Sequence, residues 1–241
     1  FWRAPTDNDL GNGMQNWAQI WKNATENCKS VIMSPPKTNK HGVEMKVRFQ
    51  LPKQTAQVEM QMEFRNNGDL KIDYHFMPLK DSLPDIPRLG LYMILPNDFT
   101  QMEWYGRGPH ETYKDRKTSG KIGIYNQKIE EAFHAYPRPQ ETGNRSDTRW
   151  MALESNKLRV EAQGEQFMEC SFWPFRQSEL EFVAGKDGGE SASGLVPVTS
   201  RHGADIKTGE AVQWNIDLHM MGVGGDTSWG RMVHDEYRIP A

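Results

Sequence analysis

The sequence predicts an all-β fold in the form of a large antiparallel sandwich. Several segments alternate apolar and polar residues, and this period of two is typical of half-buried strands. Turns rich in glycine, proline and asparagine separate these segments. Segments with the three-and-four spacing of an amphipathic helix are short and few. Many strands with few helices favour two packed β-sheets over a mixed α/β architecture.

Four segments carry the clearest strand signal. Residues 43–51 and 58–64 alternate regularly, and residues 70–76 do so after a turn at residues 66–69, which predicts an antiparallel meander. Residues 212–220 alternate in the same way near the end of the chain. Further strands are expected at residues 88–95, 121–125, 148–153, 158–162 and 167–172, with a hairpin turn at residues 154–157.

Helical signals are restricted to two short segments. The large apolar residues of segment 14–21 fall at three-and-four spacing, which predicts one short helix after a loop at residues 1–13. Ser178 is a favourable N-cap for a second helix over residues 178–184. The glycine- and serine-rich stretch 185–209 predicts an exposed excursion.

Composition narrows the classes of partner. The 29 basic and 32 acidic side chains give a formal net charge of −3, which provides no electrostatic reason to bind nucleic acid or an anionic membrane. Apolar runs fall far short of the roughly 20 residues that cross a bilayer. Two cysteines, Cys28 and Cys170, predict neither a disulfide framework nor a zinc motif. We expect residues 1–241 to form one domain excised from a longer protein, because the chain opens directly in a dense motif.

The stretch from Trp104 to Trp150 combines aromatic, glycine and charged residues at high density. This composition is typical of a sugar-binding surface, where flat rings receive the pyranose and charged groups hydrogen-bond its hydroxyls. Within it, His110 and Glu111 are candidates for a general acid and base pair. Adjacent residues on an extended segment point to opposite sides, so a structural role for both is favoured.

The remaining charged residues of this stretch are also best explained by structural roles. Long irregular segments leave backbone groups without ladder partners, and Asp, Asn and Arg side chains commonly satisfy them. Salt bridges between guanidinium and carboxylate groups are expected here. The residues concerned are Asp115, Arg116, Glu141, Arg145, Asp147 and Arg149.

Several other kinds of site have no support in the sequence. The seven histidines lack metal-binding spacing, no GxSxG motif occurs, and the glycines at residues 222–226 precede no lysine or helix. We therefore expect no metal ion and no cofactor in this segment. Trp229 follows glycines and polar residues, so its indole is either a hydrophobic plug or an exposed platform. The residues themselves leave both interpretations open.

Four motifs are spread along the chain. They are FWRAPTDND at residues 1–9, WYGRGPHETYKDRK at 104–117, RPQETGNRSDTRW at 138–150 and GVGGDTSWG at 222–230. Their content and order resemble the C-terminal (fifth, small-chain) domain of bacterial β-galactosidases of glycoside hydrolase family 2. The resemblance covers essentially the whole chain. It implies an antiparallel β-supersandwich like that of galactose mutarotase.

The resemblance also implies how this segment functions. In the family, the acid/base and nucleophile glutamates lie on a preceding (β/α)₈ barrel, so no catalytic residue is expected here. A tryptophan of the GGDxSW turn stacks on the sugar at the rim of the active site, and Trp229 matches it. Asp226, Ser228, Arg107 and His110 are candidate neighbours in substrate binding. The implied partners are the galactoside, the barrel and other domains of one enzyme, and further copies of the enzyme, with neither nucleic acid nor membrane.

One segment departs from the family pattern, and one alternative function stays open. The family has a YT-containing segment and a short helix ending in alanine and histidine, whereas residues 172–189 read FWPFRQSELEFVAGKDGG, with Lys186 at the histidine position or that position lost. No function is assigned to that region. The alternative function is a stand-alone sugar-binding or mutarotase-like aldose epimerase domain. An epimerase requires His110 or His134 to converge with a glutamate on one concave face.

Overall fold

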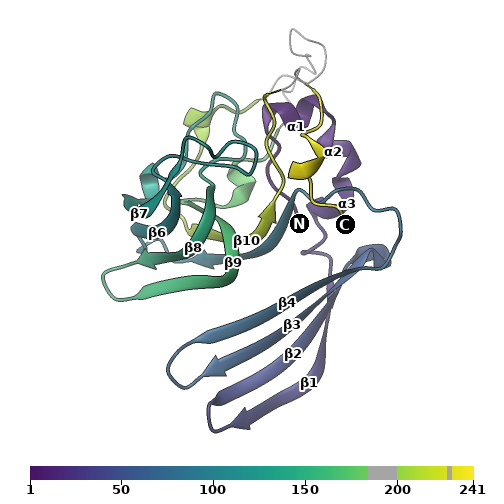
Figure 1. Cartoon of the computed structure of the whole chain (residues 1–241), viewed down its shortest axis with the longest axis vertical. Helices are drawn as coiled ribbons and strands as arrows, with labels where there is room; N and C mark the ends of the chain where they lie inside the picture. Colours follow the sequence, from purple (N-terminus) through teal and green to yellow (C-terminus); the bar gives the residue numbers. More distant parts are fainter. Residues whose placement is uncertain (184–199, 227–229) are drawn as a thin grey trace. The chain divides into compact units, whose positions relative to one another are not determined.

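The computed structural model describes residues 1–183, 200–226 and 230–241. Within these ranges strands dominate and helices are short, and the strands form one four-stranded and one six-stranded sheet (Figure 1). Neighbouring strands of both sheets pair in antiparallel fashion. The predicted all-β, antiparallel fold class is confirmed.

The chain divides into two compact units, which we name the large unit and the small unit. The large unit consists of residues 1–19 and 86–239, and the small unit of residues 20–85 and 240–241. The six-stranded sheet belongs to the large unit and the four-stranded sheet to the small unit. That the whole chain folds as one domain stays a prediction.

The small unit is built on a meander of four strands. They are β1 (Lys29–Asn39), β2 (Gly42–Gln50), β3 (Ala56–Arg65) and β4 (Leu70–Pro78), paired in that order. The last three confirm the predicted alternating strands and the turn at residues 66–69. The alternation pattern does not predict β1, which contains Pro35 and Pro36. β1 accommodates these prolines because it lies at the edge of the sheet and its pairing shifts register twice around them.

The large unit contains the six-stranded sheet, in the order β5-β10-β9-β8-β6-β7. Its strands are β5 (Arg88–Leu95), β6 (Gln101–Gly108), β7 (Lys121–Lys128), β8 (Arg145–Glu154), β9 (Arg159–Trp173) and β10 (Val212–Met220). The predicted strands at residues 88–95, 121–125, 148–153 and 212–220 are confirmed. The predicted hairpin turn at residues 154–157 connects β8 to β9.

Two strands of this sheet differ from the prediction. β9 is one continuous strand of 15 residues, where the sequence predicts two, because polar residues between them lie opposite a register shift in β8. β6 forms where a long loop is expected. Its glycines weaken the strand signal but are needed sterically. A Cβ on Gly106 would lie 2.9 Å from Thr148 Oγ1, and one on Gly108 would lie 2.8 Å from the Tyr125 ring.

The N-terminal helices also differ from the prediction. α1 (Asp7–Gly11) forms where a loop is expected, because Thr6 and Asp9 make a capping box at its start. The single helix predicted over residues 14–21 is wrong: two single turns form, α2 (Met14–Trp17) and α3 (Gln19–Lys22). Throughout the described ranges, no helix is long and apolar enough to cross a membrane.

The helix predicted over residues 178–184 is wrong in its described part. A 3₁₀ turn, η3 (Gln177–Glu179), takes its place, and the Gln177 amide donates to the Gln213 side chain, 2.8 Å away. Ser178 therefore does not cap a helix. Of the glycine- and serine-rich stretch, residues 185–199 lie outside the described residues. The other 3₁₀ turns are η1 (Pro52–Gln54), η2 (Ile129–Glu131), η4 (Gly203–Asp205) and η5 (Asp235–Tyr237).

The six-stranded sheet buries a different kind of side chain on each face. Phe172 of β9 and Trp214 of β10 are paired in register, and their ring centroids lie 5.3 Å apart in the main apolar core. The alternate residues of β10 are Gln213, Asn215 and Asp217, with exposed fractions of 4%, 1% and 1%. At β10 and at Glu169 and Ser171 of neighbouring β9, the second face of the sheet is therefore a buried polar layer.

Candidate functional site

The first sequence motif is folded by its own polar residues. Arg3 and Asp9 form a buried ion pair, with Nη2 and Oδ1 2.9 Å apart. The Asp9 amide donates to the Thr6 hydroxyl over 3.1 Å, and the Thr6 amide donates to Asp9 Oδ2 over 3.0 Å. The Asp7 amide then donates to Gln140 Oε1, 3.2 Å away. This last contact connects the N-terminal motif to the motif at residues 138–150.

Glu111 connects the loop at residues 109–120 to the loop that precedes β8. Its carboxylate accepts hydrogen bonds from the Gly143 amide (2.7 Å), the Thr142 hydroxyl (3.1 Å) and the Tyr136 hydroxyl. Burial and the hydrogen bond to Glu111 raise the pKa of Tyr136 to about 12, so this phenol remains a neutral donor. These contacts support the structural interpretation of Glu111.

The two candidate histidines, His110 and His134, contact a serine and a tyrosine. His110 Nε2 lies 2.9 Å from Ser119 Oγ at the surface. The His134 ring packs edge-on against Tyr136, with ring centroids 4.5 Å apart. Among the described residues, neither imidazole is hydrogen-bonded to a glutamate. This arrangement weighs against an epimerase pair.

Arg107, at the end of β6, is bonded within the protein. Its Nε pairs with Asp147, and its Nη1 donates to the carbonyls of Lys117 (3.1 Å) and Gly120 (2.8 Å). Lys117 Nζ also contacts Asp147, 2.7 Å away. Burial acts to raise the pKa of Asp147, but hydrogen bonds from Lys117 and Arg107 lower it below its ordinary value. Arg107 as a substrate ligand stays a prediction.

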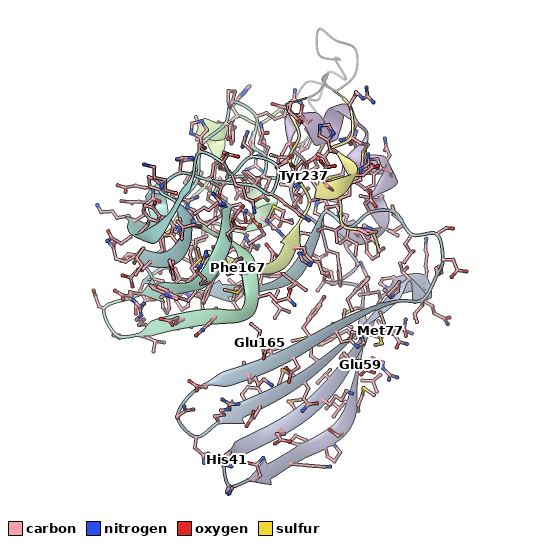
Figure 2. The ribbon with its side chains drawn as sticks, viewed as in Figure 1. His41, Glu59, Met77, Glu165, Phe167 and Tyr237 are labelled. Atoms are coloured by element: carbon pink, nitrogen blue, oxygen red, sulfur yellow. The ribbon has the colours of Figure 1, made fainter. Side chains whose placement is uncertain are left out.

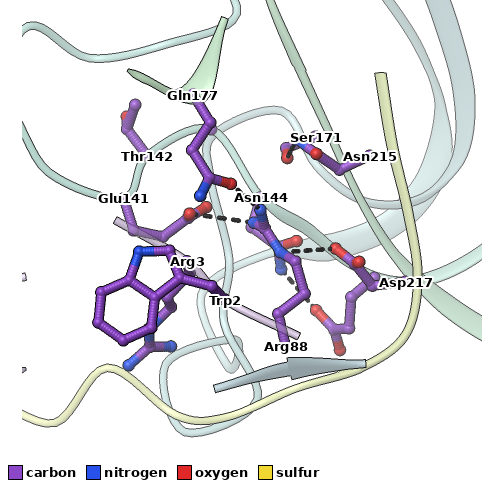
Figure 3. A network of polar contacts seen from close by, with 12 residues as sticks. Trp2, Arg3, Arg88, Glu141, Thr142, Asn144, Ser171, Gln177, Asn215 and Asp217 are labelled. Carbon is purple, nitrogen blue, oxygen red and sulfur yellow. Dashed lines mark hydrogen bonds and ion pairs between the residues drawn. The ribbon is translucent and has the colours of Figure 1, made fainter. Parts of the chain in front are cut away.

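Arg88 lies between two buried carboxylates on the polar face of the sheet (Figure 3). Its guanidinium is 3.0 Å from Glu141 and 3.1 Å from Asp217. Burial raises the pKa of Glu141 to about 7 and that of Asp217 to about 6, although Arg88 lowers both. Burial alone would lower the pKa of Arg88, but the two carboxylates raise it, so the guanidinium stays charged. The cluster joins β5, β10 and the third motif.

Another buried carboxylate, Glu169, lies on β9 directly opposite Asp217. It accepts hydrogen bonds from Asn144 Nδ2 and from Ser146 Oγ, the latter over 2.8 Å. Asn144 also donates to the Thr112 carbonyl over 2.8 Å, which connects the second and third motifs. Burial raises the pKa of Glu169 to about 7, against the opposing effect of its two hydrogen bonds.

Several of the buried charged residues are not evident from the sequence pattern. A signal was nevertheless present in segment 212–220, whose second face is neutral or short-chained (Gln, Asn, Asp) and lacks the Lys and Glu typical of a solvated strand. The unidentified residues are Arg3, Asp9, Arg88, Glu169 and Asp217.

The turn at residues 222–226 meets the 109–120 loop through Asp115, whose Oδ2 accepts from the Gly224 amide over 2.7 Å. Asp226 is exposed, and its Oδ2 lies 2.8 Å from His234 Nε2. The turn that carries Asp226 is thus bonded to the loop that carries His110. Ser228 and Trp229 lie outside the described residues, so their part in the site stays a prediction.

No competing site stands out elsewhere in the described ranges. Within them, no group of three or more His, Cys, Asp or Glu side chains is arranged to hold a metal ion. The small unit has a hollow beside the β1–β2 turn, where His41 lies (Figure 2). Its side chains are exposed or half-buried, so no buried polar group is directed into it. They are Lys40, His41, Glu63, Arg65, Asn66 and Asn67.

The fold and the site define an antiparallel all-β chain whose four motifs are hydrogen-bonded to one another around a buried polar layer. A family model described as beta galactosidase small chain matches residues 1–241. The chain belongs to the β-galactosidase small-chain family. The resemblance predicted from the four motifs is confirmed.

Curated relatives agree with this assignment. The chain is 31% identical over 244 residues to a β-galactosidase of Priestia megaterium, and 32% identical over 248 residues to one of Halalkalibacterium halodurans. It is 32% identical over 245 residues to a β-galactosidase of Lactobacillus delbrueckii subsp. bulgaricus. Each alignment covers 100% of this chain and 22% of the relative. The chain thus spans about a fifth of their length and corresponds to their C-terminal part.

Proposed function

We propose that this chain is the C-terminal domain of a β-galactosidase that hydrolyses terminal β-D-galactosides with retention of configuration. The observation that carries the proposal is the family match over residues 1–241. It is supported by curated relatives that are named β-galactosidases and of which this chain covers 22%. On this proposal the chain supports a catalytic barrel located elsewhere in the same enzyme.

The environments of the buried carboxylates support a catalytic centre outside this chain. A retaining glycosidase needs two carboxyl groups about 5–5.5 Å apart on either side of the scissile bond. Glu141 and Asp217 are buried against Arg88, and Glu169 is held by Asn144 and Ser146. These groups are occupied by structural contacts, so we assign no catalytic residue, metal ion or cofactor to the chain.

The proposed contribution to substrate binding comes from the segment after the 222–226 turn. Trp229 would present its indole face to the apolar face of the galactose ring, with Asp226, Ser228, Arg107 and His110 as polar neighbours. The exposure of Asp226 and the bond between its turn and the 109–120 loop support this placement. The proposed partners are the galactoside, the barrel and other domains of the enzyme, and further copies of the subunit.

The test is the Trp229→Ala substitution in the intact β-galactosidase that contains this chain. We expect KM for a chromogenic galactoside to rise about tenfold, because a lost stacking contact of about 1.4 kcal/mol corresponds to that factor. Trp229→Phe is the matched control and should retain most of the affinity, since it keeps an aromatic face. Unchanged kinetics for Trp229→Ala would contradict the stacking role. Hydrolysis of the galactoside by residues 1–241 alone would contradict the assignment of catalysis to the barrel.

A further inference from the structure

Two side chains of the N-terminal motif hold the backbone that follows β10. Arg3 donates through Nη1 to the Met221 carbonyl and through Nη2 to the Gly222 carbonyl, the latter over 2.8 Å. Asn8 Nδ2 donates to the Val223 carbonyl over 3.1 Å. Three consecutive carbonyls are therefore bound by side chains that are more than 200 residues away in the sequence.

Asp115 holds the next residue of the chain, Gly224. Its Oδ2 accepts from the Gly224 amide over 2.7 Å. A Cβ on Gly222 would lie 2.5 Å from the same oxygen, so a side chain there would displace the carboxylate. Gly224 and Gly225 have φ values of +70° and +102°, a region that favours glycine. The glycines of the GVGG sequence therefore fit both the path of the turn and the approach of Asp115.

The side chains that contact this turn differ in how deeply they are buried. Arg3 is fully buried and bonded through two nitrogens to Asp9, which itself caps α1. Asn8 and Asp115 are only half-buried. Removing Asp115 would remove the contact to the Gly224 amide while leaving the Arg3–Asp9 pair intact. Asp115 is therefore the residue at which the turn can be loosened without opening the core.

We infer that Arg3, Asn8 and Asp115 are positioning residues for galactoside binding, which they support by fixing the backbone of the 221–224 turn. This inference rests on the proposed function, in which the segment following the turn contacts the sugar. The three side chains act through backbone groups and do not themselves bind substrate. Fixing the turn before binding lowers the entropy lost when the sugar binds, so loosening it weakens affinity.

The experiment uses Asp115→Ala and Asp115→Asn in the intact β-galactosidase. Asp115→Ala removes the acceptor for the Gly224 amide, and we expect KM to rise about tenfold while kcat changes less than about threefold. Asp115→Asn keeps an acceptor oxygen and should restore KM to within about threefold of the wild type. Asp81→Ala, at an exposed aspartate of the small unit, is the matched control and should leave KM unchanged. Thermal unfolding of each variant checks that it is folded.

A double-substitution cycle with Trp229→Ala separates the two proposals. If the turn positions Trp229, Asp115→Ala should change KM less than about twofold in the Trp229→Ala background, because the group it positions is gone. A KM raised by Trp229→Ala but not by Asp115→Ala would overturn the positioning role and leave the proposed function intact. A KM raised by Asp115→Ala but not by Trp229→Ala would overturn the role of Trp229. The turn would then position a different sugar-binding group.

Two further outcomes complete the design. Full additivity of the two substitutions would overturn positioning through Trp229, because independent effects add. Should Asp115→Ala fail to fold, Asn8→Ala carries the same test, since it removes only the half-buried contact to the Val223 carbonyl. A wild-type KM for a folded Asn8→Ala variant would then overturn the positioning role.

Discussion

The two sheets of this protein place alternating sequences in different surroundings. In β4 of the small unit, the polar residues Lys71, Asp73 and His75 are exposed, and the intervening apolar residues are half-buried. In β10 of the large unit, Trp214 and Asn215 are both almost fully buried, although the alternation is as regular. Alternation thus separates polar from apolar side chains, but it does not determine which face meets water.

The difference extends to the ion pairs on each sheet. Arg48 and Glu59 of the small unit have exposed fractions of 38% and 16%, and Figure 2 shows Glu59 on its sheet. Arg88 and Glu141 of the large unit have exposed fractions of 6% and 0%. Charges withdrawn from water interact strongly and are costly to leave unpaired, whereas exposed pairs are screened. Equivalent substitutions in the two sheets should therefore have very different effects on stability.

The largest effect is expected from Arg88→Ala. This substitution leaves Glu141 and Asp217 buried without their cation, and such a loss costs about 3–5 kcal/mol. The measurement is the free energy of unfolding from urea titration at pH 8, where both carboxylates are ionised in the wild type. The loss should shrink at pH 5, because the two carboxylates can then bind protons. A loss below about 1 kcal/mol at pH 8 would show that the buried pairs contribute no more than surface pairs.

An intermediate effect is expected from Glu169→Gln, and it should depend on pH. Burial raises the pKa of Glu169 in the folded chain from 4.5 to about 7. The contribution of Glu169 to stability is therefore fully present below about pH 4.5 and is lost as the pH rises through about 7. At about 1.4 kcal/mol per unit of pKa shift, the whole effect is at most about 3.5 kcal/mol. The neutral amide of the variant lacks this titration.

The measurement for Glu169→Gln is the difference in unfolding free energy between variant and wild type at pH 5 and at pH 8. We expect the variant to gain stability relative to the wild type as the pH rises. Glu141 and Asp217 titrate in both proteins, so their contributions enter both stability curves. Parallel stability curves for the two proteins would contradict the elevated pKa of Glu169.

Strand positions could be predicted from the sequence wherever a regular pattern lies between clear turns. β2, β3, β4 and β10 follow from alternation alone, and the four motifs are sufficient to identify the family. β6 could not be found in this way. Gly106 and Gly108 are required because neighbouring strands approach them closely, and a local sequence pattern carries no information about those strands. The capping box of Thr6 and Asp9 was a local signal for α1 that the turn-like composition of the segment concealed.

The buried polar layer could not be predicted, because its partners are distant in the sequence. Arg88 and Glu141 are 53 residues apart, and Arg3 binds a carbonyl 219 residues further along the chain. A local pattern can show that Gln213 and Asn215 share a face. Only the path of the chain determines which segments cover that face. The candidate site shares this property, since Asp115 and Gly224 come together only in the folded large unit.

The smallest effect is expected from Arg48→Ala on the small unit's sheet. Its guanidinium contacts Glu59 over 2.6 Å, but Lys46 lies 2.9 Å from the same carboxylate and would keep it paired. Because the arginine is also well exposed, we expect no resolvable change in the urea midpoint, at either low or high salt. A loss as large as that of Arg88→Ala would show that this pair is desolvated in the folded protein. Exposure to water would then not explain any difference in stability between substitutions in the two sheets.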